Sequence, residues 1–109
     1  MKKLLLVALA LCSLAVLVFG ASDSERKAIA KILYGRIRVV GSGYGDAYRV
    51  RVVDNGEDLR VRIINSGERL PGRWRFVDSG EDYRIRFVDF SEDVRVRFVD
   101  FSEGARQLP

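Results

Sequence analysis

A short phrase that alternates arginine with apolar residues is repeated six times after residue 35, and it constrains the fold more than any other feature of the sequence. The phrase is clearest in YRIRFVDFSED and VRVRFVDFSE, which follow each other directly over residues 83–103. Neighbouring copies begin 11 or 13 residues apart. The six copies are Arg36–Val40, Arg49–Val53, Arg60–Ile64, Arg73–Val77, Arg84–Val88 and Arg95–Val99.

Each copy has the pattern of a β-strand. Alternation with a period of two, rich in Val, Ile and Phe, is typical of strands, and the Asn-Gly and Ser-Gly pairs between copies are typical of hairpin turns. Ile85 and Phe87 fall on one face of their strand, whereas Arg84 and Arg86 share the other face with Val88. Because both faces carry an apolar residue near the strand end, we expect that end to be covered on both sides.

The regular spacing of the copies predicts the fold class. We expect an all-β fold of six short repeated strands in a compact closed or two-layered sheet, which leaves a sandwich, a small barrel or a solenoid open. The single tryptophan, Trp74, occupies the inward position that Val50 and Ile85 occupy in their copies. We therefore expect Trp74 to be a core anchor rather than a platform for a ligand.

The N-terminal segment has the pattern of a secretory signal peptide. Lys2 and Lys3 precede an uncharged apolar run over residues 4–19, and Gly20 ends a sequence suited to signal peptidase. We expect residues 1–20 to be a signal peptide cleaved near Gly20. The mature protein would then be exported, periplasmic or secreted, with no membrane span.

Two alternatives for this segment remain. An uncleaved anchor is possible, although the run of 16 residues over 4–19 is shorter than the roughly 20 needed to span a bilayer as a helix. Lipidation at Cys12, the only cysteine, is the other, but Leu11 stands where a lipobox needs a small residue. If cleavage follows Gly20, the mature chain contains no cysteine and no disulfide.

The segment between the signal peptide and the repeats has weak helical character. Residues 21–35 form a short helix or a linker, with Ser24 as the expected N-cap and Gly35 as the expected stop. The β-repeat domain then covers residues 36–109. The apolar residues at helical spacing are Ala28, Ile29, Ile32 and Leu33.

The repeats carry balanced charge, and their basic residue is always arginine. From Arg36 to Glu103 there are 13 arginines and 13 acidic residues. Because the planar guanidinium can grip a carboxylate with two hydrogen bonds, we expect a surface network of arginine–carboxylate pairs. The alternative is an envelope module that binds a polyanion or a protein through its arginine face or through loops 41–45 and 69–72. The candidate interaction residues are Arg84, Arg86, Arg95 and Arg97.

Composition excludes several kinds of chemistry. The chain has no histidine, and its one cysteine lies in the expected signal peptide, which removes Ser-His-Asp and Cys-His catalysis, thiol redox chemistry and His/Cys zinc sites. The turns over 54–58 and 78–82 resemble calcium loops only faintly, since they lack EF-hand spacing. We expect no enzyme activity, no catalytic or metal-binding residues and no cofactor. The balanced charge also argues against a nucleic-acid partner.

The last three copies are similar to a known family. Their matching phrases are Phe76-Val77-Asp78, Phe87-Val88-Asp89 and Phe98-Val99-Asp100, each followed by an acidic turn. They resemble the repeats of a bacterial domain of unknown function, the 7(1) septoil knot domain, and the resemblance spans Gly35 to Gly104. It implies a small all-β domain whose chain threads into a knot with seven crossings, and it brings no catalytic or binding residues. We expect an exported bacterial protein with a structural or interaction role and an unknown partner.

Overall fold

The computed structural model describes residues 21–105, which contain one helix and seven strands. The expected signal peptide, with Cys12, lies outside the described residues, as do residues 106–109. An all-β fold with six repeated strands and a short helix is confirmed, and β7 is a strand that the repeat did not predict. The elements are α2 Asp23–Ile32, β1 Gly35–Val39, β2 Tyr48–Val52, β3 Leu59–Ile63, β4 Arg73–Phe76, β5 Tyr83–Phe87, β6 Val94–Phe98 and β7 Gly104–Ala105.

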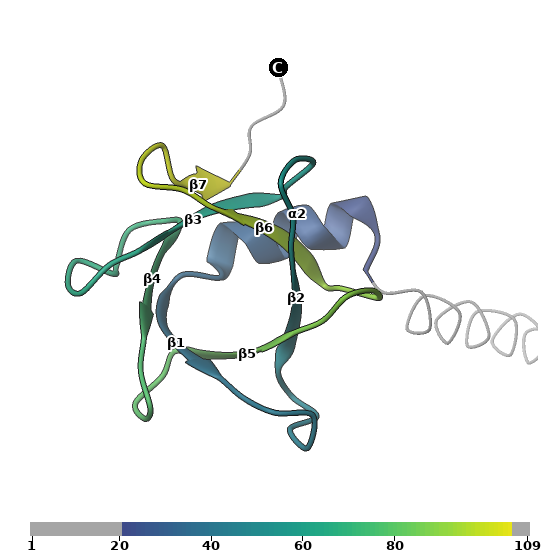
Figure 1. Ribbon diagram of the computed structural model, residues 1–109, viewed down its shortest axis with the longest axis horizontal. Helices are drawn as coiled ribbons and strands as arrows, with labels where there is room; N and C mark the ends of the chain where they lie inside the picture. Colours follow the sequence, from purple (N-terminus) through teal and green to yellow (C-terminus); the bar gives the residue numbers. More distant parts are fainter. Residues whose placement is uncertain (1–20, 106–109) are drawn as a thin grey trace, which may run out of the picture.

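Strands β1 to β6 close into a barrel in which every neighbouring pair is parallel (Figure 1). Their order around the ring is β4-β1-β5-β2-β6-β3, and β3 also pairs with β4 to complete it. β7 adds a short antiparallel pairing at the start of β3. Of the expected architectures, the structure is therefore the small closed barrel, in which these six strands leave no free edge for association with other sheets.

The Asn-Gly and Ser-Gly turns do not form hairpins, which corrects the expectation from their sequence. Gly56 and Gly80 have the left-handed φ that such turns need, 71° and 72°. Each of these two turns nevertheless leads to a strand two places further round the ring, and the Ser66-Gly67 turn leads from β3 to its parallel neighbour β4. Parallel neighbours usually need a crossover of a dozen or more residues. Here the strands are very short and staggered, so that Ile37 pairs with Phe76 of β4 on one side and Tyr83 of β5 on the other.

The chain goes round the barrel in two interleaved laps. Strands β1, β2 and β3 take alternate places, and β4, β5 and β6 fill the three gaps between them. Six equivalent backbone hydrogen bonds join the two laps. In each, the N–H of a copy's last apolar residue donates to the carbonyl oxygen of an inward-facing residue in the middle of a strand of the other lap, at 2.9–3.0 Å. The donor and acceptor pairs are Val40 and Ile85, Val53 and Val96, Ile64 and Trp74, Val77 and Ile37, Val88 and Val50, and Val99 and Val61.

The core fills the inside of the barrel, and α2 closes the end at which the strands begin. The middle inward residues are fully buried, and Leu33 and Ala30 from the helix segment join the same cluster. Trp74 donates its indole N–H to the carbonyl oxygen of Leu33 at 2.8 Å, which fixes the helix end against the barrel. The middle inward residues are Ile37, Val50, Val61, Trp74, Ile85 and Val96.

Helix α2 begins two residues earlier than expected. Its N-cap is Ser22 rather than Ser24, because Ser22 and Glu25 form a capping box in which each satisfies a backbone N–H of the other. Glu25 stands three residues after Ser22, the spacing that this motif requires, whereas Lys27 stands three residues after Ser24.

The opposite end of the barrel is open. Because all six strands run in the same direction, their last inward side chains meet at one opening, where each is 40–49% exposed. We call these six side chains the mouth ring. The expectation that the strand ends would be covered on both faces is therefore wrong, since the only helix among the described residues packs at the other end. The mouth ring is Val39, Val52, Ile63, Phe76, Phe87 and Phe98.

Candidate functional site

The outer wall of the barrel is a network of arginine–carboxylate pairs, as expected from the balanced charge. Its repeating unit is a turn glutamate that bridges arginines on two neighbouring strands. Glu57 receives hydrogen bonds from Arg60 Nε at 3.0 Å and Arg97 Nη2 at 3.2 Å. Glu81 lies 2.8 Å from Arg84 Nε and 3.7 Å from Arg38 Nη1. The same arrangement joins Glu92 to Arg95 and Arg51, and Glu103 to Arg73 and Arg62.

Burial makes these glutamates depend on their arginines. Burial raises the pKa of Glu57, which is only 6% exposed, but hydrogen bonds from the backbone, Arg60 and Arg97 outweigh it and lower the pKa to about 2. The pKa of Glu81 is lowered chiefly by its hydrogen bond from Arg84, and that of Glu103 by Arg73. The stability that Glu57 contributes is fully present above its ordinary pKa near 4.5 and is lost as the pH falls toward 2.

Turn aspartates tie the two laps together through the backbone. Asp82 accepts a hydrogen bond from the Arg36 N–H at 2.8 Å and donates its own N–H to the Arg36 carbonyl at 2.8 Å. Asp93 makes the same pair of bonds to Arg49, and its carboxylate also binds the Arg49 guanidinium at 2.9 Å. Each clamp fixes the register of one strand against a strand of the other lap.

The predicted interaction arginines are mostly engaged by these carboxylates. Arg95 is held by Glu92 at 2.7 Å and Arg97 by Glu57 at 3.2 Å. Arg84 is held by Glu81 and by Asp46 at 3.2 Å. Arg86 donates to the Ser42 carbonyl at 3.4 Å, and it alone among the strand arginines of residues 21–105 has no carboxylate oxygen within 4.0 Å. The arginine face is therefore a neutralised surface rather than a free basic patch.

The two loops proposed as binding sites differ in their contacts. Loop 41–45 folds back on the arginine wall, where Tyr44 lies 5.7 Å from the Arg38 guanidinium and 5.9 Å from that of Arg84. Loop 69–72 borders a hollow of 510 Å³ beside the end of α2. The one carboxylate that lines this hollow belongs to Asp82, which already clamps Arg36. The Asp82 side chain is 47% exposed, unlike a general acid held in an enclosed apolar pocket.

The mouth ring is the part of the site that the analysis of individual strands did not find. Around the opening the side chains follow the order Phe76, Val39, Phe87, Val52, Phe98, Ile63. Phenylalanine from the second lap thus alternates with a β-branched residue from the first. In the sequence the same residues form two blocks, three aliphatic and then three aromatic. That block pattern was a visible signal, but only the strand order converts it into an alternating ring.

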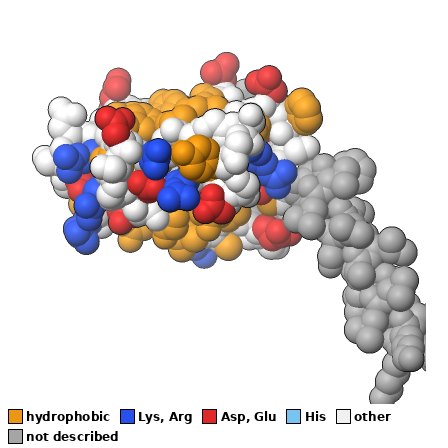
Figure 2. All heavy atoms as spheres, turned by 90° about the horizontal axis from the view of Figure 1, so that it is seen from below, with side chains coloured by type: hydrophobic (Ala, Val, Ile, Leu, Met, Phe, Trp, Pro, Cys, Tyr) orange, Lys and Arg blue, Asp and Glu red, His pale blue; other side chains and the backbone are white. Residues whose placement is uncertain are grey.

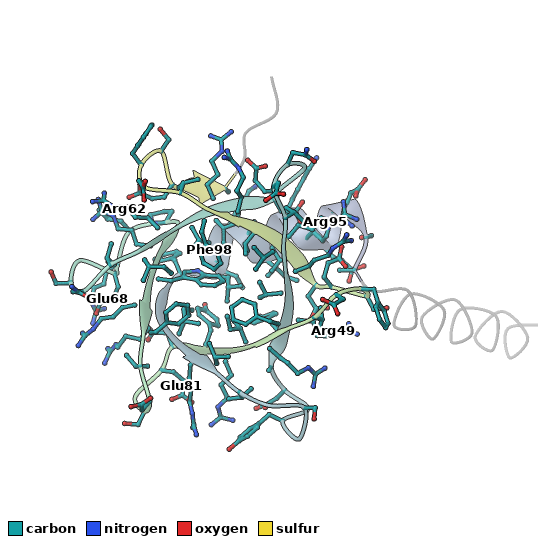
Figure 3. All side chains as sticks on the ribbon, in the orientation of Figure 1. Arg49, Arg62, Glu68, Glu81, Arg95 and Phe98 are labelled. Carbon is teal, nitrogen blue, oxygen red and sulfur yellow. The ribbon has the colours of Figure 1, made fainter. Side chains whose placement is uncertain are left out.

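Charges surround the mouth ring without covering it. In Figure 3 Phe98 points toward the middle of the barrel, whereas Arg62, Arg95 and Glu81 lie on its periphery. Figure 2 shows the body edge-on, with hydrophobic side chains along its upper and lower faces, most Lys and Arg side chains in the band between them, and several acidic side chains projecting from the upper face. A hollow of 450 Å³ at the rim is lined by Phe76 and Val39 of the ring and by charged neighbouring residues. Its lining residues are Arg38, Val39, Phe76, Val77 and Asp78.

The described residues form neither a cluster of metal-ligating side chains nor a helix suited to crossing a membrane. No three acidic or cysteine side chains within residues 21–105 come together as a metal ion would require. Within the same range, no helix is both long and apolar enough to cross a bilayer.

The fold and the sequence agree with one family. The sequence model of the 7(1) septoil knot domain matches residues 30–106, which include all seven strands. This chain belongs to the 7(1) septoil knot domain family. No curated protein matches the sequence. In this septoil knot domain, each strand of the second lap lies between two strands of the first.

Proposed function

We propose that this septoil knot domain is an exported, non-enzymatic interaction domain whose contact surface is the mouth ring. One observation carries the proposal: six apolar side chains gather at one opening, each 40–49% exposed, on a body whose charges neutralise one another. Contiguous apolar patches on monomers rarely exceed a few hundred Å² and are often functional when they do. A rigid closed barrel that keeps such a patch in one geometry loses little conformational freedom on binding.

The electrostatics favour the mouth ring over the arginine wall as the contact surface. A polyanion site needs cations that are not already paired, whereas carboxylates of the domain itself hold nearly all of the strand arginines. Four exposed aspartates follow the strand ends and make no ion pair within residues 21–105. They would repel an anionic partner, and they are Asp54, Asp78, Asp89 and Asp100.

Export is supported by the signal-peptide pattern. Lys2, Lys3 and the apolar run over 4–19 have the order that secretion requires. Ala21, the first residue after the expected cleavage site, donates its N–H to the Glu92 carbonyl at 3.3 Å, and its own carbonyl accepts from Arg26.

A photocrosslinking experiment tests both parts of this proposal. The full chain is produced in a bacterium with benzoylphenylalanine in place of Phe87, a member of the mouth ring. A matched variant carries it in place of Phe90, which is 76% exposed but lies outside the ring. We expect ultraviolet light to yield a covalent protein adduct from position 87 and much less from position 90. We also expect the recovered protein to have the mass of a chain that starts at Ala21.

Each readout can fail separately. Adducts that form equally from positions 87 and 90, or from neither, would contradict an interaction role for the mouth ring. A recovered chain that still contains residues 1–20 would contradict export by a cleaved signal peptide.

A further inference from the structure

We propose that two copies of this chain associate face to face through their mouth rings, related by a two-fold axis that lies in the plane of the interface. This inference rests on the proposed function, because it names the partner of the same surface.

The alternation of large and small side chains makes the ring complementary to itself. Going round the opening, Phe76, Phe87 and Phe98 are separated by Val39, Val52 and Ile63. Suppose that one copy is turned over and laid on the other so that the two rings face each other. If one ring is then rotated by one side-chain position, every phenylalanine lies opposite a β-branched residue of the other copy. Facing layers that pair large with small side chains interdigitate and leave few voids. Three orientations of the two-fold axis in the plane of the interface give this pairing of phenylalanine with β-branched residues.

The charged rim also fits a second copy better than an anionic surface. The hollow that holds Phe76 contains one arginine and one aspartate, Arg38 and Asp78. A second hollow, of 260 Å³, holds Phe98 together with Arg97 and Asp100. Arg38 and Arg97 are paired with Glu81 and Glu57, but their side chains stay 33% and 38% exposed, so a two-fold axis can bring them opposite the rim aspartates of a second copy. A second copy brings arginines that can face these aspartates, whereas phospholipid headgroups or a nucleic acid bring only further negative charge.

The available area suits a modest but specific dimer. If a fully exposed phenylalanine presents about 200 Å² and valine or isoleucine somewhat less, exposed fractions of 40–49% give the ring about 500 Å² of apolar surface. A standard interface buries about 800 Å² on each partner. The rim arginines and aspartates can supply the remainder, which gives an apolar centre and a polar edge, as in other interfaces.

Sedimentation equilibrium of the purified mature protein tests the inference with one pair of variants. We expect the wild-type chain to show a monomer–dimer equilibrium. Phe87→Asp places two carboxylates in the apolar centre of the dimer, and we expect it to weaken association by about 100-fold or more. Phe90→Asp makes the same chemical change three residues away and outside the ring, and we expect it to leave the equilibrium unchanged.

Circular dichroism of each variant checks that the barrel is intact. If Phe87→Asp does not fold, Ile63→Asp, on the opposite side of the ring and 45% exposed, provides the same test. A wild-type chain that stays monomeric at millimolar concentration, or a dimer that Phe90→Asp disrupts and a folded ring variant does not, would overturn the inference. An adduct from position 87 with the mass of a different protein would refute the dimer and leave the interaction role standing. No adduct at all would refute both.

Discussion

Replacing Trp74 with alanine is expected to reduce the free energy of unfolding by about 3–5 kcal/mol, the usual cost of removing a buried tryptophan. The side chain is fully buried in the middle of the barrel. It packs edge-on against Phe76 and Phe98, with ring centroids 6.2 and 6.1 Å away, and it binds the Leu33 carbonyl. Loss of the indole would therefore weaken the core, the mouth ring and the attachment of α2 to the barrel together.

Urea unfolding followed by far-ultraviolet circular dichroism measures this effect, because the variant has no tryptophan left to report by fluorescence. Trp74→Phe keeps most of the apolar volume but cannot donate to Leu33, and we expect it to cost less than Trp74→Ala. If Trp74→Ala does not fold, the smaller loss in Trp74→Phe remains measurable. A loss below about 1 kcal/mol in Trp74→Ala would mean that the indole is not packed as described.

Gly72→Ala is expected to destabilise the domain by at least about 2 kcal/mol, the sum of a left-handed backbone and an overpacked contact. Gly72 has a φ of 79° and lies where the connection before β4 meets both β3 and β7. An added Cβ would stand 2.8 Å from the Arg60 carbonyl oxygen and 2.7 Å from the Gly104 Cα, and closer still to the Gly104 nitrogen. All three neighbours are backbone atoms, which cannot rotate away.

Gly45→Ala is the matched control for this substitution. Gly45 has no positive φ, and an added Cβ would meet nothing within 4 Å. We expect a change within about 0.5 kcal/mol in the same unfolding experiment. Equal stability of the two variants would show that the connection before β4 does not pass close to Gly104.

The strands and their inward residues could be predicted from the sequence because they depend on local periodicity. Ile85 and Phe87 stand two positions apart, and they do share the inner face. The exposure of Phe87 could not be predicted in the same way, since it depends on which end of the barrel α2 covers. The N-cap was misplaced because Ser22 and Ser24 are both plausible caps, and only the Glu25 side chain distinguishes them.

The order of the strands could not be predicted because the six copies are nearly equivalent. By side-chain pattern alone any copy can pair with any other, and the turn sequences by themselves favour hairpins between consecutive copies. The real partners are far apart: Glu57 binds Arg97 across 40 residues of sequence. A network of carboxylates could be expected from the charge balance, but not which arginine each one holds. The candidate site could not be predicted for the same reason, because the alternating mouth ring arises only from the interleaved strand order.

Disulfide trapping is the most direct test of the interleaved barrel. In a Cys12→Ser background, Arg51→Cys and Arg95→Cys place thiols on directly paired residues of β2 and β6. Arg51→Cys with Arg62→Cys places them on strands that follow each other in the chain but have β6 between them, more than about 10 Å apart and too far to bond. Mass spectrometry after mild oxidation should show a disulfide within one chain for the 51–95 pair and free thiols for the 51–62 pair. The reverse pattern would contradict the two-lap order and the mouth ring that depends on it.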